Sequence, residues 1–230
     1  MSGSSSQRDN QTRSFLTKSK SIGLPDGLVR ATLEPYQVVV SDAQIEAIRK
    51  YMDLLLLWNH KVSLTSIVDP GEILDRHFGE SMFAAAKFSI LKGRLADVGS
   101  GAGFPGLALK IIRPELHVTL IEANAKKSAF LAEVARDLGL NGVDVLRARY
   151  EDLPLGAIQA DFIAARAVGR LPQLLEWASG SLSPAGQVVL WLGAQDAENI
   201  LRVREWNWTG PVPIPRSRRR MLLAGQKPAP

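Results

Sequence analysis

The chain has 230 residues, 46% of them apolar, which is enough to bury the core of one α/β domain with an appendage. It contains no cysteine and only three histidines, so we expect neither disulfides nor thiolate chemistry nor a metal site. Its formal net charge of +5 indicates a polyanionic partner.

The beginning of the chain divides into a polar and a helical part. Residues 1–27 are rich in Ser, Gln, Asn, Lys and Arg without apolar periodicity, which predicts a disordered basic tail. A capping box at Ser41 predicts the start of one helix, and Asp69 followed by proline predicts the start of a second, which continues to about residue 88. We therefore expect residues 28–92 to form an N-terminal helical cap.

From residue 93 to the end, strand-like apolar segments alternate with helical ones. The strand candidates are residues 94–98, 117–121, 143–147, 160–164 and 187–191. This alternation predicts an α/β fold with a doubly wound, mostly parallel sheet. Two closing strands without a clear crossover helix predict an antiparallel C-terminal edge. We expect 93–230 to be the core domain, with the cap packed on it as one compact unit.

No stretch of the sequence suits a membrane. The longest dense apolar run, residues 54–58, is far too short to cross a bilayer, and the polar N-terminus lacks the apolar core of a signal peptide. The sequence therefore predicts a cytoplasmic protein without membrane contact.

The most informative segment follows the first predicted strand and reads Asp97-Val-Gly-Ser-Gly-Ala-Gly-Phe-Pro-Gly106. Glycine lets the backbone turn sharply with no side chain to keep a ligand away. The apolar stretch after it predicts a helix whose N-terminus faces that ligand. A nucleotide cofactor is therefore expected, either a dinucleotide such as NAD or S-adenosylmethionine.

The residues within this turn favour S-adenosylmethionine. Gly101, Gly103 and Gly106 match the dinucleotide pattern G-x-G-x-x-G, but that match alone is weak. A carboxylate at Asp97 would repel a pyrophosphate, whereas it suits the ammonium and sulfonium groups of S-adenosylmethionine. Pro105 also removes an N–H group that a pyrophosphate would need. NAD stays the less favoured alternative.

Acidic residues after the next two predicted strands fit the same cofactor. Glu122 ends the second strand and can accept hydrogen bonds from both ribose hydroxyls. Tyr150 and Glu151 follow the third strand, where an adenine needs an acceptor and a flat wall. A glycine turn, a ribose acid and an adenine acid at successive strand ends are typical of a methyltransferase cofactor cleft.

Further segments on both sides of this turn carry a resemblance to a known family. They are Trp58-Asn59, Leu64-Thr-Ser-Ile67, Asp69-Pro-Gly-Glu-Ile73, His77, Lys127, Phe130-Leu131, Arg149-Tyr-Glu151 and Ala165-Arg-Ala167. With the glycine turn, they resemble the bacterial small-subunit ribosomal RNA guanine-N7 methyltransferase family, also called glucose-inhibited division protein B. The resemblance covers roughly residues 40–224.

The resemblance implies a class I, Rossmann-like methyltransferase that uses S-adenosylmethionine to methylate N7 of a guanine in 16S ribosomal RNA. It also implies cofactor contacts by Gly99, Phe104, Tyr150, Glu151 and Arg166. Together with the residues above, the predicted cofactor site is Asp97, Gly99, Gly101, Gly103, Phe104, Glu122, Tyr150, Glu151 and Arg166.

The sequence departs from the family pattern in three places. Ser63 stands where an Asn usually precedes Leu-Thr, and Glu80 replaces an Asp. Leu192 stands where a Lys is common. A missing cation near a polyanion is expected to weaken binding, with the arginines of residues 216–220 supplying charge instead.

The chemistry of guanine N7 needs few catalytic groups. Its lone pair carries no proton, so no general base is required, and alignment with water exclusion is expected to supply the catalysis. Arg166, directly after the fourth strand, is the predicted catalytic residue, orienting the cofactor and contacting guanine O6 or a phosphate. The alternative for Arg166 is a surface arginine paired with an acid.

Five side chains are predicted to contact the RNA: Asn59, His77, Arg218, Arg219 and Arg220. For Asn59 and His77 the alternative is a hydrogen-bonding network that docks the cap onto the sheet. The expected partner is 16S ribosomal RNA within the small subunit or an assembly intermediate, bound by a monomer. The alternative functions are a cofactor-binding ribosome-assembly factor with weak or lost catalysis, and a methyltransferase of another substrate.

Overall fold

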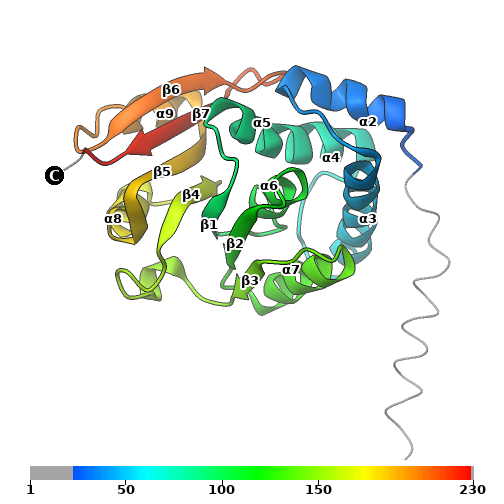
Figure 1. The fold of residues 1–230 in the computed structure, drawn as a ribbon, viewed down its shortest axis with the longest axis horizontal. Helices are drawn as coiled ribbons and strands as arrows, with labels where there is room; N and C mark the ends of the chain where they lie inside the picture. The colour runs from blue at the N-terminus through cyan, green and yellow to red at the C-terminus, as the bar shows by residue number, and fades with distance from the viewer. Residues whose placement is uncertain (1–22, 229–230) are drawn as a thin grey trace, which may run out of the picture.

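The computed structural model describes residues 23–228, so the predicted basic tail, 1–27, lies almost wholly outside the described residues. The described chain forms a seven-stranded sheet with the order β3-β2-β1-β4-β5-β7-β6 (Figure 1). The strands are β1 (Gly93–Val98), β2 (Leu116–Ile121), β3 (Val143–Leu146), β4 (Ala160–Arg166), β5 (Leu182–Gly193), β6 (Asn207–Pro213) and β7 (Arg220–Gln226).

Helices connect the strands and form the cap. The cap holds α2 (Asp26–Leu33), α3 (Asp42–Asn59), α4 (Pro70–Ile73) and α5 (Glu80–Lys87), with the 3₁₀ turn η1 (Glu34–Tyr36) and the π-helical segment η2 (Leu74–Gly79). The sheet carries α6 (Gly106–Ile112), α7 (Ala125–Asp137), α8 (Leu171–Ser181), α9 (Ala194–Ile200) and the 3₁₀ turn η3 (Tyr150–Asp152).

The strand pairing confirms the predicted doubly wound α/β sheet. The first five strands run parallel, and all five strand candidates are strands, although β5 begins five residues before its predicted start at residue 187. The closing hairpin is antiparallel, with β7 inserted between β5 and β6. This topology brings the carboxyl ends of β1 to β5 to one edge of the sheet, which is where open α/β sheets bind ligands.

The cap follows its predicted helix starts with two differences. Ser41 and Gln44 form the expected capping box at α3, and Asp69 accepts the N–H of Glu72 at the start of α4. However, the second predicted helix is interrupted by the six-residue π segment η2. In addition, α2 begins at Asp26, so the expected boundary of the tail at residue 27 is wrong by two residues.

Two apolar clusters lie between the sheet and its helices. Consecutive residues of β1 alternate between them, as the period of a strand requires: Leu95 belongs to one and Ala96 to the other. One cluster combines α8 and α9 with the sheet, while the other continues from the sheet and α6 into cap helices α3 and α5. The cap and this face of the sheet thus share one hydrophobic core. Within residues 23–228, no helix is long and apolar enough to span a membrane.

Candidate active site

The turn between β1 and α6, residues 99–105, forms a loop that we call the glycine loop. Gly99, Gly101 and Gly103 have φ values of +68°, +57° and +88°, a left-handed backbone that glycine adopts without steric cost. The N–H groups of Gly99 and Ser100 donate to the carbonyl of Ile121, at 2.9 and 3.1 Å. The loop is therefore anchored to the carboxyl end of β2.

Gly101 leaves room beside the loop, whereas Gly99 lies close to the segment after β4. A Cβ on Gly101 would meet nothing closer than the Gly99 carbonyl oxygen, at 3.7 Å, so a ligand could approach this backbone closely. A Cβ on Gly99 would lie 3.2 Å from Cγ2 of Val168, which follows β4. The loop and the segment after β4 are thus in contact at Gly99.

The predicted cofactor residues Gly103 and Phe104 pack against Tyr51 of the cap helix α3. A Cβ on Gly103 would lie 2.2 Å from the Tyr51 hydroxyl, which donates to the carbonyl of Ala102. The Phe104 ring is 7% exposed and stacks on Tyr51, with ring centroids 5.1 Å apart. Both residues therefore dock α3 onto the glycine loop, and a backbone contact with the cofactor stays a prediction.

Asp97 lies near the end of β1 and is completely buried. Its Oδ2 accepts the N–H of Gly106 at 2.9 Å, while Oδ1 has no hydrogen-bond partner among the described residues. Burial raises the pKa of Asp97 to about 7, against the lowering effect of the Gly106 N–H. A buried acceptor without a partner is costly, so Asp97 fits a site that receives a cationic donor such as the ammonium group of S-adenosylmethionine.

Glu122 directly follows β2 and holds the glycine loop in place. Its Oε2 accepts the N–H of Gly101 at 2.9 Å, and its Oε1 accepts the N–H of Asn124 at 2.8 Å. Each carboxylate oxygen has a second lone pair, so ribose hydroxyls can still donate to Glu122. The sequence predicted the ribose contact but missed the contact with the loop.

Tyr150 and Glu151 lie in the turn η3, which follows β3. This is the position after the third strand at which the sequence predicts an adenine contact. The Tyr150 ring is 7% exposed and packs edge-on against Trp177 of α8, with ring centroids 5.6 Å apart. Glu151 is exposed. Their contact with the adenine stays a prediction.

Arg166, the last residue of β4, is held by the cap. Its Nη2 donates to the Arg76 carbonyl at 3.0 Å and to Oε2 of Glu80 at 3.1 Å. Glu80 is 1% exposed and also pairs with Arg220 of β7. Burial raises the pKa of Glu80, although both guanidinium groups oppose that shift. Arg166 is thus paired with an acid, as the alternative expects, but that acid is buried and shared with Arg220.

Glu80 is the functional residue that the sequence reasoning undervalued. In the sequence it departs from the family pattern and lies three residues after His77, where it is expected either to close the cleft over the substrate or to dock the cap onto the sheet. In the fold it is the common partner of two arginines. The available signal was its place between Phe78 and Phe83, in a stretch of the cap with no other charged residue before Lys87. An acid on a buried helix face needs a cationic partner.

Asn59 and His77, predicted to contact RNA, both form hydrogen bonds within the cap. Asn59 Oδ1 accepts the N–H groups of Leu64 and Thr65 at 2.8 and 3.0 Å, and its Nδ2 donates to the Thr65 carbonyl at 2.8 Å. His77 Nε2 lies 2.8 Å from the Thr65 hydroxyl, and its ring stacks on Phe104. Burial lowers the pKa of His77 to about 3, with Arg166 as the next cause. The stacking on Phe104 supports the docking alternative for His77, whereas the Asn59 amide holds the turn that follows it. An RNA contact by either residue stays a prediction.

The predicted arginine cluster divides into two pairs. The register of Gly193 against Arg220 places the cluster beside the carboxyl end of β5. Arg220 turns inward to Glu80, and Arg216 pairs with Asp75 at 3.0 Å, so these two connect the hairpin to the cap. Arg218 and Arg219 are exposed and have no acidic partner among the described residues. They are the two that can meet a phosphate without breaking an ion pair.

A cavity of about 330 Å³ opens where β4 and β5 end, and we call it the strand-end pocket. Its lining residues are Arg166, Ala167, Val168, Leu171, Trp191, Leu192, Gly193, Asp196 and Arg220. Because Val168 also contacts Gly99, the pocket lies next to the glycine loop. It therefore adjoins the place where a methyl donor would bind.

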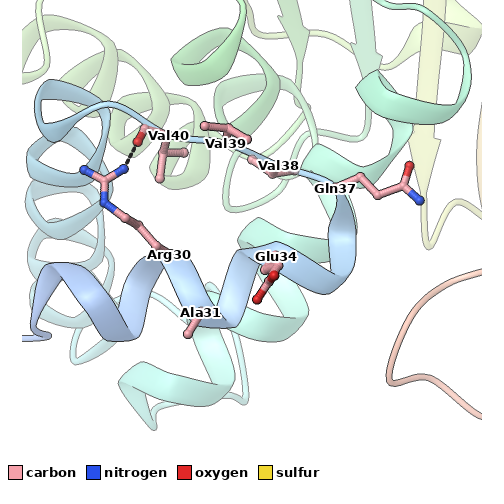
Figure 2. Close-up of a pocket in the computed structure, with 7 residues that line it drawn as sticks. All are labelled: Arg30, Ala31, Glu34, Gln37, Val38, Val39 and Val40. Carbon is pink, nitrogen blue, oxygen red and sulfur yellow. Dashed lines mark hydrogen bonds between the residues drawn. The ribbon is translucent and has the colours of Figure 1, made fainter.

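A second hollow, of about 660 Å³, lies in the cap between α2 and residues 37–40 (Figure 2). Across it Arg30 donates to the carbonyl of Val40, and the same guanidinium pairs with Asp42. Its walls are mainly aliphatic and include no residue of a strand end. The Arg30 guanidinium already has two partners. This hollow is therefore a weaker candidate for a nucleotide site than the strand-end pocket.

The sheet order and the acids at its strand ends define a class I S-adenosylmethionine-dependent methyltransferase. Solved structures share the fold. A SAM-dependent methyltransferase from Aquifex aeolicus aligns with 68% of this chain and 93% of its own, at 18% identity and a TM-score of 0.56. A ribosomal protein L11 methylase from Lactobacillus delbrueckii subsp. bulgaricus aligns with 66% and 79%, at 18% identity and a TM-score of 0.54.

Sequence relatives narrow the class to a family. The sequence model of GidB, described as rRNA small subunit methyltransferase G, matches residues 44–209. The proteins named Ribosomal RNA small subunit methyltransferase G of Desulfitobacterium hafniense and Roseiflexus castenholzii are 41% and 42% identical over 182 and 164 residues. Those alignments cover 77% and 70% of this chain, and 75% and 70% of the relatives.

The chain belongs to the GidB family of rRNA small subunit methyltransferases. The resemblance, the fold class and the choice of S-adenosylmethionine over NAD are thereby confirmed. Within residues 23–228, no group of three or more His, Asp or Glu side chains is placed to hold a metal ion.

The charge of Asp97 is expected to act in opposite directions on binding and on stability. Asp97→Asn keeps an acceptor for Gly106 but removes the charge, so we expect affinity for S-adenosylhomocysteine at pH 8 to fall about tenfold or more. The wild-type affinity should also fall as the pH drops below about 7, because the acid protonates. Calorimetric titration from pH 5.5 to 8.5 measures both effects.

The folded-state pKa of Asp97 lies above its ordinary value of 3.8, so ionisation destabilises the free protein as the pH rises from about 4 through 7. Asp97→Asn should therefore raise the Tm at pH 8 while it weakens binding. The exposed acid Asp144 of β3 gives the control, Asp144→Asn, which should change neither quantity. If Asp97→Asn bound S-adenosylhomocysteine with wild-type affinity and with the same dependence on pH, Asp97 would not contact the cofactor.

Glu80→Gln leaves the Arg166 and Arg220 guanidiniums without their shared counter-charge. We expect the free energy of unfolding to fall by about 3 kcal/mol, since a buried pair broken on one side leaves an uncompensated charge. Urea denaturation measures this loss. Glu72→Gln, which breaks the exposed pair with Arg76, is the control and should cost about 0.5 kcal/mol or less. If both variants lost the same free energy of unfolding, the buried Glu80 cluster would contribute no more stability than an exposed ion pair.

Proposed function

We propose that this protein transfers the methyl group of S-adenosylmethionine to N7 of a guanine in small-subunit (16S) ribosomal RNA, in the cytoplasm. The relatives' names supply the class of RNA, and the sequence resemblance supplies the guanine N7. The observation that carries the proposal is the contact of Val168 with Gly99, which sets an arginine-lined pocket directly beside the glycine loop.

S-adenosylmethionine supplies a methyl group that its sulfonium makes electrophilic. Asp97 would hold the ammonium group of the cofactor, and Glu122, which fixes the loop, would accept hydrogen bonds from its ribose hydroxyls. Arg166, held rigidly by Glu80 and the Arg76 carbonyl, orients the guanine through O6. Catalysis then comes from holding N7 in line with the methyl carbon.

This reaction needs no proton acceptor, and the site residues agree with that. Guanine N7 attacks with a free lone pair, and the methyl carbon passes from sulfur to nitrogen without loss of a proton. His77 is uncharged at neutral pH but is buried against Phe104 and bonded to Thr65. Trp191 and Leu192 give the pocket apolar walls that exclude water.

The RNA is proposed to present the guanine outside its stack, because N7 must reach a pocket at the sheet edge. Arg218 and Arg219 contact the neighbouring phosphates at the same edge of the sheet. Every residue in this arrangement comes from one chain, so a monomer is sufficient. The folded RNA of the small subunit, or of an assembly intermediate, provides the shape that holds the guanine in place.

The test is transfer of labelled methyl from S-adenosylmethionine to small subunits that lack N7-methylguanine, with the product mapped by N7-specific strand cleavage. We expect label at one guanine N7. Label at another atom or in protein would assign the enzyme a different substrate. Tight cofactor binding without any transfer would favour the alternative of an assembly factor that has lost catalysis.

The salt dependence of RNA binding tests the role of Arg218 and Arg219. Replacing both with alanine should reduce the slope of log K against log salt by about 0.7 for each phosphate that the protein no longer neutralises. Arg202 and Arg204 are the matched control, because they are exposed arginines that precede β6 at the opposite end of the hairpin. Equal slopes for the two double variants would rule out a specific phosphate contact at Arg218 and Arg219.

A further inference from the structure

The strand-end pocket contains a carboxylate that no step above uses. Asp196 lies on α9, is exposed, and has no hydrogen bond or ion pair with any described residue. A Cβ on Gly193 would lie 3.8 Å from its Oδ2, so the carboxylate stands close to the backbone where β5 ends. An unpaired acid thus shares one cavity with the guanidiniums of Arg166 and Arg220.

Neither arginine forms an ion pair with Asp196, and both pair with Glu80. Leu192, which is 7% exposed, forms the adjoining wall at the position where the family pattern has a lysine. With leucine there, the nearest wall offers Asp196 no cation. The pocket therefore presents donors from its arginines and a free acceptor pair from Asp196.

This arrangement matches the edges of a guanine. The Watson–Crick edge of guanine presents the N1–H and N2–H₂ donors, which a carboxylate accepts together, while O6 and N7 are acceptors. Adenine presents a lone pair at N1, which a carboxylate repels. We propose that Asp196 reads the Watson–Crick edge of the target guanine in the strand-end pocket, an inference that rests on the proposed function.

The same contact is expected to favour the reaction as well as the base. When the N7–methyl bond forms and the sulfur–methyl bond breaks, the positive charge moves from sulfur to the guanine ring. The N1–H and N2–H₂ groups then become stronger donors, so their bonds to Asp196 strengthen as the methyl group is transferred. An interaction that is stronger in the transition state than in the ground state raises kcat.

The experiment compares guanosine with inosine, which keeps N1–H, O6 and N7 and lacks only the 2-amino group. Small-subunit RNA carrying either base at the mapped position is assembled into subunits and methylated by wild type and by Asp196→Asn. We expect wild type to prefer guanosine in kcat/KM by about tenfold or more, and the variant to lose that preference together with part of its kcat. Affinity for S-adenosylhomocysteine should stay unchanged.

Glu198→Gln is the control, because Glu198 is an exposed acid of the same helix that does not line the pocket. It should behave as wild type. A full guanosine preference in Asp196→Asn, or none in wild type, would overturn the role of Asp196 while leaving the proposed function intact. Absence of methyl transfer to any guanine N7 by wild type would remove both.

Discussion

A single buried carboxylate, that of Glu80, determines how the three parts of this molecule meet. It begins α5 in the cap and pairs with Arg166 at the end of β4 and with Arg220 at the start of β7. Its own carbonyl accepts the Trp191 indole N–H of β5 at 2.8 Å. The cap, the parallel strands and the closing hairpin therefore converge on one residue. Since three of its partners also line the strand-end pocket, the shape of that pocket depends on Glu80.

The π segment η2 helps to place this carboxylate. A π turn contains more residues than an α turn, so it changes which side chains face the sheet after it. Through η2 the helix presents His77 to Phe104 and Thr65, and Glu80 then begins α5 facing β4. Such irregular turns occur often at functional sites, and here the irregular turn immediately precedes the residue that holds Arg166.

Local features could be predicted from the sequence because each depends on neighbouring residues. The capping box of Ser41, the alternating strands and the glycine loop after β1 all follow from short patterns. The Glu80 cluster could not be predicted in this way, because its partner Arg166 is 86 positions away. Charge and spacing do not reveal which of several arginines an acid will meet.

The same limit applies to residues whose contacts within the protein the sequence does not show. Gly103 matched a nucleotide-binding pattern, yet its missing side chain makes room for Tyr51, which lies in another part of the sequence. Asn59 has the polarity of a substrate contact, but its amide is used by the turn that follows it. In a single sequence, a glycine or a polar side chain is compatible both with a ligand contact and with packing against a distant helix. The residue type alone does not distinguish the two.

The distribution of charge around the reacting atoms follows from the reaction itself. Methyl transfer carries a positive charge from a sulfonium to a purine ring, so both ends of the path gain from a nearby carboxylate. Asp97, buried with one unpaired oxygen, is proposed for the cofactor side, where a bound cation would stabilise a charge that is costly to the free protein. Asp196, exposed in the strand-end pocket, lies on the guanine side, where solvent stabilises its charge until the base enters. Arg166, which lines the same pocket as Asp196, is restrained by Glu80, so in the proposed mechanism its charge is available to orient the base.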